Sequence, residues 1–354
     1  MQRLTLAGAL LAPSLLAFAP TQAPLAVEAV RFAPAEGLSL TKTYTITSES
    51  ELEDQETLVN GEAPPADMDM EMTNVSTMSL TVTDTYVGMG EGRPTKLART
   101  FDSLGSDATT EMVVPMMGPQ EMEVTSTSEL EEQTVHFVWD AEADEYAVRF
   151  PEDAEDADEE LLEGLTEDLD FRAFLPDGEV AEGDSWEVSP SALMDVMAPG
   201  GDLKLEADST DEMGMGPDAG QQMSDMLGEI EGELSAQLTG FREADGTRMA
   251  VIALTFDVTS SNDLTDMIME AMAEQEAPMG MDMDIESVDV SVAMEGEGEL
   301  VWNLSAGHFS ALTLEAEITT DTDMAMSMAM GTESMSLEQS MTNSGTITIE
   351  ASAE

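Results

Sequence analysis

The sequence contains no cysteine. Disulfide bonds, thiol catalysis, cysteine-ligated zinc and iron–sulfur clusters are therefore excluded, and so is a lipid attached to an N-terminal cysteine. Aromatic residues make up only 5% of the 354 residues, so the core must consist of Leu, Val, Ile, Ala and Met. Hydrophobic residues as a whole reach 42%, which is enough for a sizeable core and excludes a disordered acidic tail.

Basic residues are also scarce, with 11 Lys and Arg against 75 Asp and Glu and a formal net charge of -64. Nucleic acid is excluded as a partner because phosphate binding needs clustered Lys and Arg. Docking on anionic lipid is disfavoured for the same reason. The charge attracts cations and basic proteins, and salt screens its self-repulsion. The composition is typical of a solubilising surface in a saline or ion-rich compartment.

The N-terminus has the layout of a secretory signal peptide over residues 1–23, with Arg3 followed by an apolar run that ends at Phe18. The run is about 15 residues long and contains Pro13, so it falls short of the roughly 20 residues that span a bilayer. Cleavage is expected between 19 and 29. No later stretch is long and apolar enough to span. We therefore expect a soluble exported protein, periplasmic or secreted.

Alternation of apolar and polar residues dominates the chain after residue 37 and predicts strands with one buried face. Val135, Phe137 and Trp139 begin a predicted hairpin that returns through 146–150. The run 312–318 and the return through 335–349 are longer than usual strands. The predicted fold class is mainly β, a β-dominated α+β fold. Its long antiparallel strands form twisted sheets shaped like a clam or open barrel, with a few short helices.

Helical spacing of apolar residues is confined to short segments. It predicts helices over 155–169, 190–197, 221–230 and 262–273. The predicted organisation is a signal peptide (1–23), an N-terminal β-rich half with short helices (24–198), a linker or loop rich in Gly, Met, Pro and Asp (199–220), and a C-terminal antiparallel β half (221–354).

Methionine is abundant, with 30 residues, and often alternates with another residue. Thioether sulfur is a soft ligand that selects Cu(I), so such runs in loops near carboxylates favour a copper or silver site. Two runs supply the candidate metal ligands: Met68, Met70, Met72, Met279, Met281 and Met283. A third run, 324–330, continues a strand, where Met fills one apolar face. The same core-filling interpretation is the alternative for the first two runs.

Calcium is the other candidate cation, through the acidic run 152–160. Calcium binds several carboxylate oxygens around a sharp turn, but the EF-hand pattern does not occur. The run predicts weak calcium association by charge, or simply a solvated helix start. No cofactor is predicted.

One segment, Gly183–Trp186, resembles the start of a GDSL-type hydrolase motif, in which Ser185 would be the nucleophile. The motif lies mid-chain, and His308 lacks the accompanying Asp. A turn followed by a strand anchored by Trp186 explains the segment better. Neither His136 nor His308 has a nearby nucleophile, so the chain is predicted not to be an enzyme.

A single basic cluster contains Arg93, Lys96 and Arg99. It either binds an anionic ligand or forms ion pairs with acidic residues on neighbouring strands. The overall charge favours ion pairs, and each exposed pair would contribute about 0–1 kcal/mol to stability.

The stretch Leu175–Trp186 resembles a group of exported bacterial proteins of unknown function, which carry a leucine-proline, valine, glycine-aspartate-serine-tryptophan element. Gly296–Trp302 followed by Ala306–Phe309 resembles their closing hairpin. The resemblance covers two short stretches. It implies a β-rich envelope protein and transfers no catalytic residue.

Three functions follow as hypotheses. The first is an exported non-enzymatic protein that binds an apolar ligand or a protein partner on a curved β-sheet. The second is a cation-binding protein that uses weak calcium sites or Met-x-Met copper sites. The third is a hydrolase acting through Ser185, for which the sequence offers no base.

Overall fold

The computed structural model describes residues 27–63, 70–114, 118–152, 154, 158–207, 228–244, 246–274, 282–330 and 333–354. The predicted signal peptide lies outside this part of the chain. So does 208–220, the larger part of the predicted linker.

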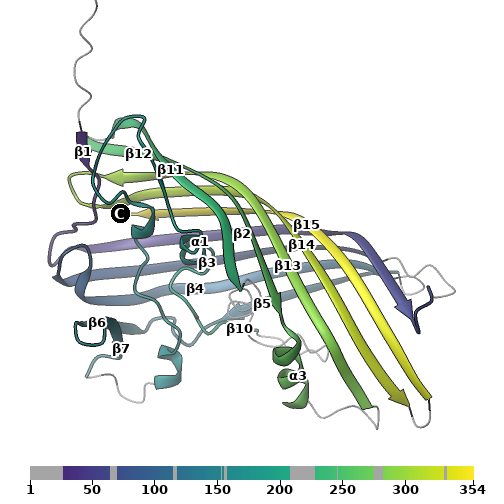
Figure 1. Cartoon of the computed structure of the whole chain (residues 1–354). Helices are drawn as coiled ribbons and strands as arrows, with labels where there is room; N and C mark the ends of the chain where they lie inside the picture. Colours follow the sequence, from purple (N-terminus) through teal and green to yellow (C-terminus); the bar gives the residue numbers. More distant parts are fainter. Residues whose placement is uncertain are drawn as a thin grey trace, which may run out of the picture.

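A 13-stranded antiparallel sheet dominates the structure (Figure 1). Its order is β10-β5-β4-β3-β2-β15-β14-β13-β12-β11-β9, and β6 and β7 branch from β4. The first long strand, β2, pairs with the last, β15, so the two predicted halves join in the middle of one sheet. In the described part of the chain the sheet does not close into a barrel. The predicted mainly-β fold with long antiparallel strands and few helices is confirmed.

The strands of this sheet are β2 (Ser39–Val59), β3 (Glu71–Met89), β4 (Pro94–Val114), β5 (Gly118–Thr127), β6 (Thr134–Asp140), β7 (Glu145–Arg149), β9 (Ser185–Glu187), β10 (Glu206–Ala207), β11 (Glu229–Ala244), β12 (Thr247–Asp263), β13 (Asp282–Asn303), β14 (His308–Met330) and β15 (Glu333–Ala353). A separate two-stranded sheet pairs β1 (Val27–Ala29) with β8 (Glu179–Ala181). The helical elements are η1 (Glu159–Leu162), η2 (Arg172–Phe174), α1 (Ala192–Met197) and α3 (Thr265–Glu274).

The sheet has an apolar inner face and a polar outer face because its strands alternate. In β14, Leu312, Leu314 and Ala316 are buried, whereas Thr313 and Glu315 between them are exposed. The same alternation runs along β2, β3, β12 and β15. The core therefore lies on the inner side of the curved sheet.

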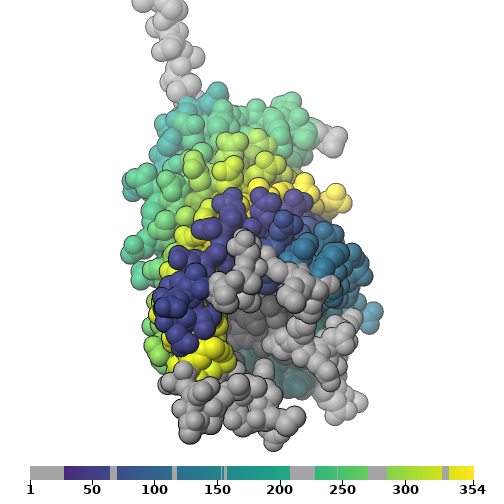
Figure 2. Space-filling model, turned by 90° about the vertical axis from the view of Figure 1, so that its right-hand side faces the viewer, coloured from purple at the N-terminus to yellow at the C-terminus, as the bar shows by residue number. Residues whose placement is uncertain are grey.

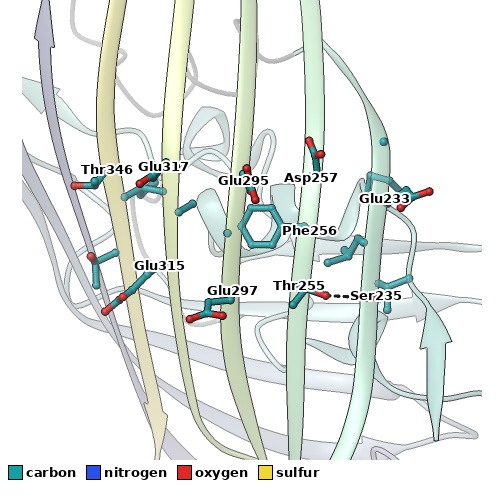
Figure 3. A pocket seen from close by; sticks show the side chains of 18 of the residues that line it. Glu233, Ser235, Thr255, Phe256, Asp257, Glu295, Glu297, Glu315, Glu317 and Thr346 are labelled. Carbon is teal, nitrogen blue, oxygen red and sulfur yellow. Dashed lines mark hydrogen bonds between the residues drawn. The ribbon is translucent and has the colours of Figure 1, made fainter.

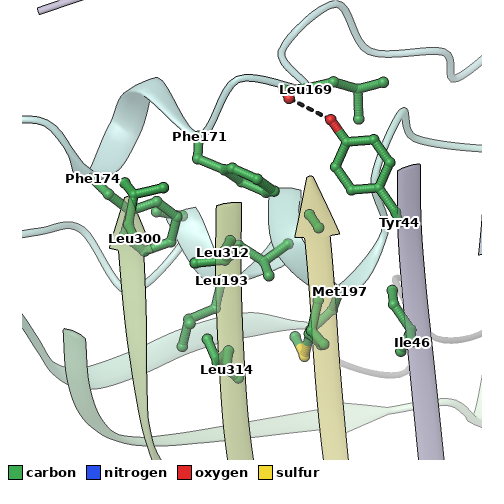
Figure 4. Close-up of a cluster of buried hydrophobic side chains, with 14 of the residues drawn as sticks. Tyr44, Ile46, Leu169, Phe171, Phe174, Leu193, Met197, Leu300, Leu312 and Leu314 are labelled. Atoms are coloured by element: carbon green, nitrogen blue, oxygen red, sulfur yellow. Dashed lines mark hydrogen bonds between the residues drawn. The ribbon is translucent and has the colours of Figure 1, made fainter. Parts of the chain in front are cut away.

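A cover segment, residues 158–207, packs against one end of this inner face (Figure 4). Its Leu169, Phe171 and Phe174 lie over β2, β14 and β13 in turn, and the Phe171 ring meets the Phe309 ring edge to face at a centroid distance of 5.0 Å. Helix α1 adds Leu193 and further apolar side chains to the same layer. The cover segment thus buries one end of the inner face, while β13, β14 and β15 extend beyond it (Figure 1).

The helix predictions had mixed outcomes. Helices over 190–197 and 262–273 are confirmed as α1 and α3. The helix over 155–169 is wrong, because the described residues there form only the short turn η1, and Gly164 follows it with a φ of 79°. Of the segment 221–230, residues 221–227 lie outside the described chain, and Glu229 and Ile230 begin β11 rather than a helix. None of the helices in the described chain is long and apolar enough to cross a membrane.

Candidate functional site

A fully buried cluster of charges lies between the sheet and the cover segment. We call Lys42, Asp84, Arg99 and Asp170 the charged clasp, and all four are 0% exposed. Lys42 Nζ lies 2.9 Å from Asp84 Oδ2 and 2.8 Å from Asp170 Oδ1. Arg99 donates to both oxygens of Asp84, from Nε at 2.8 Å and from Nη2 at 2.9 Å. The two cations and two carboxylates balance, as a buried ionic cluster requires.

Further hydrogen bonds tie the cover segment to the clasp. Tyr86 donates its hydroxyl to both oxygens of Asp170 at 2.9 Å, and Tyr44 donates to the Leu169 carbonyl at 2.5 Å (Figure 4). Arg99 also donates to the backbone carbonyls of Thr166 and Glu167, at 2.9 and 2.8 Å. Side chains from β2, β3 and β4 therefore hold the cover segment by its backbone and by Asp170.

The clasp is strongly biased towards its charged state. Burial alone raises the pKa of Asp84, but Arg99 and Lys42 outweigh burial and bring that pKa to about 2. Burial opposes the charge of Lys42 as well, yet Asp170 and Asp84 raise the pKa of Lys42 overall. Burial, and then the negative charge of Asp170, raises the pKa of the Tyr86 hydroxyl. Asp84 and Lys42 therefore both stay charged through neutral pH.

A second group of acids beside the clasp is imperfectly neutralised. Glu167 pairs with Arg172, but its Oε1 is buried without a hydrogen-bond partner. Burial, aided by Asp168, outweighs Arg172 and raises the pKa of Glu167 to about 7. On α1, burial and then Asp168 raise the pKa of Asp195 to about 6. This end of the molecule therefore carries carboxylates whose ionisation opposes folding.

Of the predicted basic cluster, Arg99 forms an ion pair within the chain, but not of the expected kind. Arg99 is buried in the clasp, so the expectation of weak exposed pairs is wrong for it. Arg93 instead stacks on the Trp139 ring at 4.1 Å from the ring centroid. Three of the 11 Lys and Arg residues, Lys42, Arg99 and Arg172, lie in or beside the clasp. Because the clasp is closed to solvent, its role is to anchor the cover segment.

Replacing Tyr86 by Phe is expected to lower the free energy of unfolding by about 1.5–3 kcal/mol, because the lost bonds go to a charged acceptor. The matched variant Tyr44→Phe loses a bond to a neutral carbonyl, so we expect about 0.5–1.5 kcal/mol. Urea unfolding of both variants measures the difference. Equal losses would contradict the importance of the Asp170 charge.

Beyond the cover segment, the inner face carries methionines interspersed with polar side chains, among them Thr320, Thr322, Gln339 and Asn343. The inward side chains of β14 change from buried Leu312 and Leu314 to half-buried residues from Ile318 onward. We call the following eight residues the distal methionine face: Met72, Met112, Met122, Met324, Met326, Met328, Met335 and Met341. None of them is buried.

Strand register brings these methionines together from distant parts of the sequence. Met72 of β3 lies directly opposite Met112 of β4, and Met328 of β14 opposite Met335 of β15. These methionines lie on the same inner face as the core. The strand register shows no shift between Leu80 and Met72 or between Leu314 and Met328, so every second residue keeps facing inward. Figure 2 is seen from this distal side and shows the N-terminal strand region (purple) next to the C-terminal one (yellow), as the pairing of β2 with β15 requires. The result is a concave surface of flexible, polarizable side chains.

The candidate metal ligands are only partly described. Met68, Met279 and Met281 lie outside the described residues. Met283 is part of β13, Met70 immediately precedes β3, and Met72 belongs to the distal methionine face. In the described chain, no group of three or more His, Asp or Glu side chains is arranged to hold a metal ion. The copper site stays a prediction.

The outer face carries an acidic groove of about 1240 Å³ (Figure 3). Glu233, Asp257, Glu295 and Glu317 lie directly opposite one another on successive strands from β11 to β14. Among the described residues that line the groove, none is Lys or Arg. Like charges in direct opposition destabilise a sheet. The groove therefore attracts mobile cations, as the predicted solvated acidic surface implies.

The residues of the hydrolase-like motif lie in a turn and a short strand. Gly183 donates its backbone N–H to the Leu238 carbonyl, and Asp184 accepts from the backbone of Ala181. Ser185 is exposed in β9, opposite Gln237 of β11. The indole N–H of Trp186 donates to the Phe174 carbonyl. The motif thus attaches the cover segment to β11.

The two histidines lie in different environments. His308 is buried at the start of β14, where Nδ1 lies 2.6 Å from the Phe309 carbonyl oxygen. His136 alternates with the buried Val135 and Phe137 in β6, and so occupies the opposite face of that strand.

No family model matches the chain. No curated protein matches it either. Solved structures that match include the outer membrane protein OprG from Pseudomonas aeruginosa, with 8% identity and a TM-score of 0.24 over 90% of this chain and 98% of that one. An outer membrane channel from Pseudomonas putida F1 matches with 7% identity and a TM-score of 0.25, over 91% of this chain and 97% of that one. These likenesses are too weak to assign a function.

Proposed function

We propose that the chain is an exported, non-enzymatic protein that binds an apolar ligand on the distal methionine face. The observation that carries this proposal is the change along the inner face. Leu312 and Leu314 are buried beneath the cover segment, whereas Met324, Met326 and Met328 on the same face of the same strand are not. A concave surface that is rich in methionine and open beyond a packed core is suited to an apolar ligand.

Methionine suits such a surface because its unbranched thioether adapts to ligands of different shape. The acids on the outer face keep the protein dispersed, and they repel anionic ligands. We therefore expect neutral apolar molecules to be preferred. The export part of the proposal rests on the signal-peptide pattern of residues 1–23.

The proposal is tested with a neutral fluorescent probe, N-phenyl-1-naphthylamine, titrated into the exported protein. We expect saturable fluorescence enhancement. Replacing Met72, Met112, Met326 and Met328 by Gln is expected to weaken binding about tenfold or more, because the face becomes polar at similar volume. The control replaces the outward neighbours Thr73 and Ser327 by Gln and should bind like the unmodified protein. Absence of saturable binding to the unmodified protein would refute the proposal.

A further inference from the structure

The methionines of this chain fall into two groups that differ in access to solvent. Met197, Met249 and Met294 are core residues with exposed fractions of 8%, 9% and 3%. The distal methionine face contains none that is buried, and Met335 reaches 38%. Reagents dissolved in water therefore meet the thioethers of the distal face before those of the core.

The chain has no thiol to react first. Cysteine thiolate is ordinarily the side chain that two-electron oxidants attack, but this sequence contains none. Methionine, at 30 residues, is the main remaining target. Concentrating eight of these on one surface makes that surface the part of the described molecule where oxidation has its largest local effect.

We propose that the distal methionine face is a site of oxidative modification, at which hydrogen peroxide or hypochlorous acid converts thioethers to sulfoxides and so ends apolar binding. With peroxide, a sulfur lone pair attacks one oxygen, an S–O bond forms and the O–O bond breaks. The sulfur loses two electrons, and the second oxygen leaves as water with both protons. The binding consequence rests on the proposed function, whereas the modification itself does not.

Register makes the chemical change severe. Met72 lies opposite Met112, and Met328 opposite Met335, so oxidation sets polar sulfoxides side by side where apolar groups met before. A sulfoxide is polar and chiral, and it disrupts methionine-rich contact surfaces. The core under the cover segment depends instead on Leu, Val and Phe, together with the buried Met197 and Met294. Oxidation should therefore remove the apolar surface while leaving the fold intact.

The first measurement maps oxidation without reference to ligand binding. The folded protein is exposed to hydrogen peroxide, and Glu-C and Asp-N digests are analysed by mass spectrometry over time. Met326 and Met341 are expected to become sulfoxides at least about tenfold faster than the core residues Met249 and Met294, because burial limits access. Equal rates at core and distal positions would overturn the proposed site, whatever the binding result.

The second measurement follows N-phenyl-1-naphthylamine binding before and after peroxide. We expect oxidation to abolish binding and the two methionine sulfoxide reductases, which act on opposite sulfoxide epimers, to restore it. Leucine at Met72, Met112, Met326 and Met328 should preserve binding through peroxide treatment. The matched control is Met267→Leu with Met269→Leu, which removes exposed methionines of α3 and should lose binding like the unmodified protein.

The outcomes separate the two proposals. If the untreated protein does not bind the probe, the proposed function fails, and the oxidation map alone decides whether the distal face is a modification site. If the untreated protein binds and the fully oxidised protein binds equally well, the proposal that oxidation ends apolar binding is overturned and the proposed function stands. Protection by the α3 substitutions, but not by those on the distal face, would also overturn it.

Discussion

Replacing Asp84 by Asn is expected to lower the free energy of unfolding by about 3–5 kcal/mol, because it leaves buried cations without their partner. Asp84 accepts both hydrogen bonds of the Arg99 fork and one from Lys42, and all three side chains are fully buried. Asparagine keeps the shape but removes the charge that offsets the desolvation of Arg99. The loss is therefore electrostatic rather than steric.

The matched control is Asp102→Asn on the neighbouring strand β4. Asp102 is exposed and accepts one hydrogen bond from Thr83 at 2.7 Å. Replacing an exposed carboxylate of this kind should change the free energy of unfolding by no more than about 0.5 kcal/mol. Urea denaturation monitored by tryptophan fluorescence and circular dichroism measures both variants. A loss below about 1 kcal/mol for Asp84→Asn would show that the clasp does not hold the fold together.

The clasp also shows how much of the candidate site the sequence predicts. The inward positions of β2 and β3 follow from alternation with Leu40, Tyr44 and Leu80, and Lys42 and Asp84 occupy two of them. A charged residue at an inward position signals a buried partner. Alternation in the strands does not identify that partner, because Asp170 lies in the cover segment and not in a strand.

The predicted helix over 155–169 stops at the short element η1. Its leucines have helical spacing, and Leu165 and Leu169 are indeed buried. The backbone leaves the helical region directly after η1, because Glu163 is extended and Gly164 has a φ of 79°. The Thr166 and Leu169 carbonyls that follow accept hydrogen bonds from Arg99 and Tyr44. Contacts with the sheet therefore stabilise a non-helical backbone against the local preference.

The methionine pattern shows a different limit. A Met-x-Met run has the two-residue period of a strand, so the sequence correctly indicates that the run 324–330 shares one strand face. Which strands stand next to each other follows from long-range pairing. The neighbours of Met328 depend on β15 lying beside β14. The pairing of Met72 with Met112 likewise depends on the register between β3 and β4. Periodicity therefore predicts the strands, while the surface they build together requires the fold.

The stability of the folded chain is expected to be greatest near pH 4 and to fall on both sides, since one pKa unit corresponds to about 1.4 kcal/mol. On the acid side, Asp84 has a folded pKa of about 2, below its ordinary 3.8. Its contribution is present above pH 3.8 and is lost as the pH falls towards 2. That loss amounts to about 2 kcal/mol.

On the alkaline side, the sign is reversed because Glu167 has a folded pKa of about 7, above its ordinary 4.5. The stability that this residue contributes is fully present below pH 4.5 and is lost as the pH rises through 7, at a cost of about 2–3 kcal/mol. Asp195, whose pKa is raised to about 6, acts in the same direction, with a smaller effect because it is partly exposed. The groups that face Glu167 are Arg172, Asp168 and Asp170 on its own segment, Arg99 of β4 and Tyr146 of β7.

Glu167→Gln tests this assignment, because it removes the ionisation while keeping a hydrogen-bonding group beside Arg172. Urea midpoints from pH 2 to 9 at constant high salt, which screens the net charge, should show the alkaline decline reduced by about 2–3 kcal/mol at pH 8. The acid limb set by Asp84 should be unchanged. Glu163→Gln at an exposed position nearby is the control and should follow the unmodified profile. An alkaline decline that persists in Glu167→Gln would mean that general charge repulsion, rather than this buried carboxylate, sets the upper limit. A buried acid with an unpartnered oxygen would then cost the fold nothing measurable, which contradicts the desolvation argument on which its raised pKa rests.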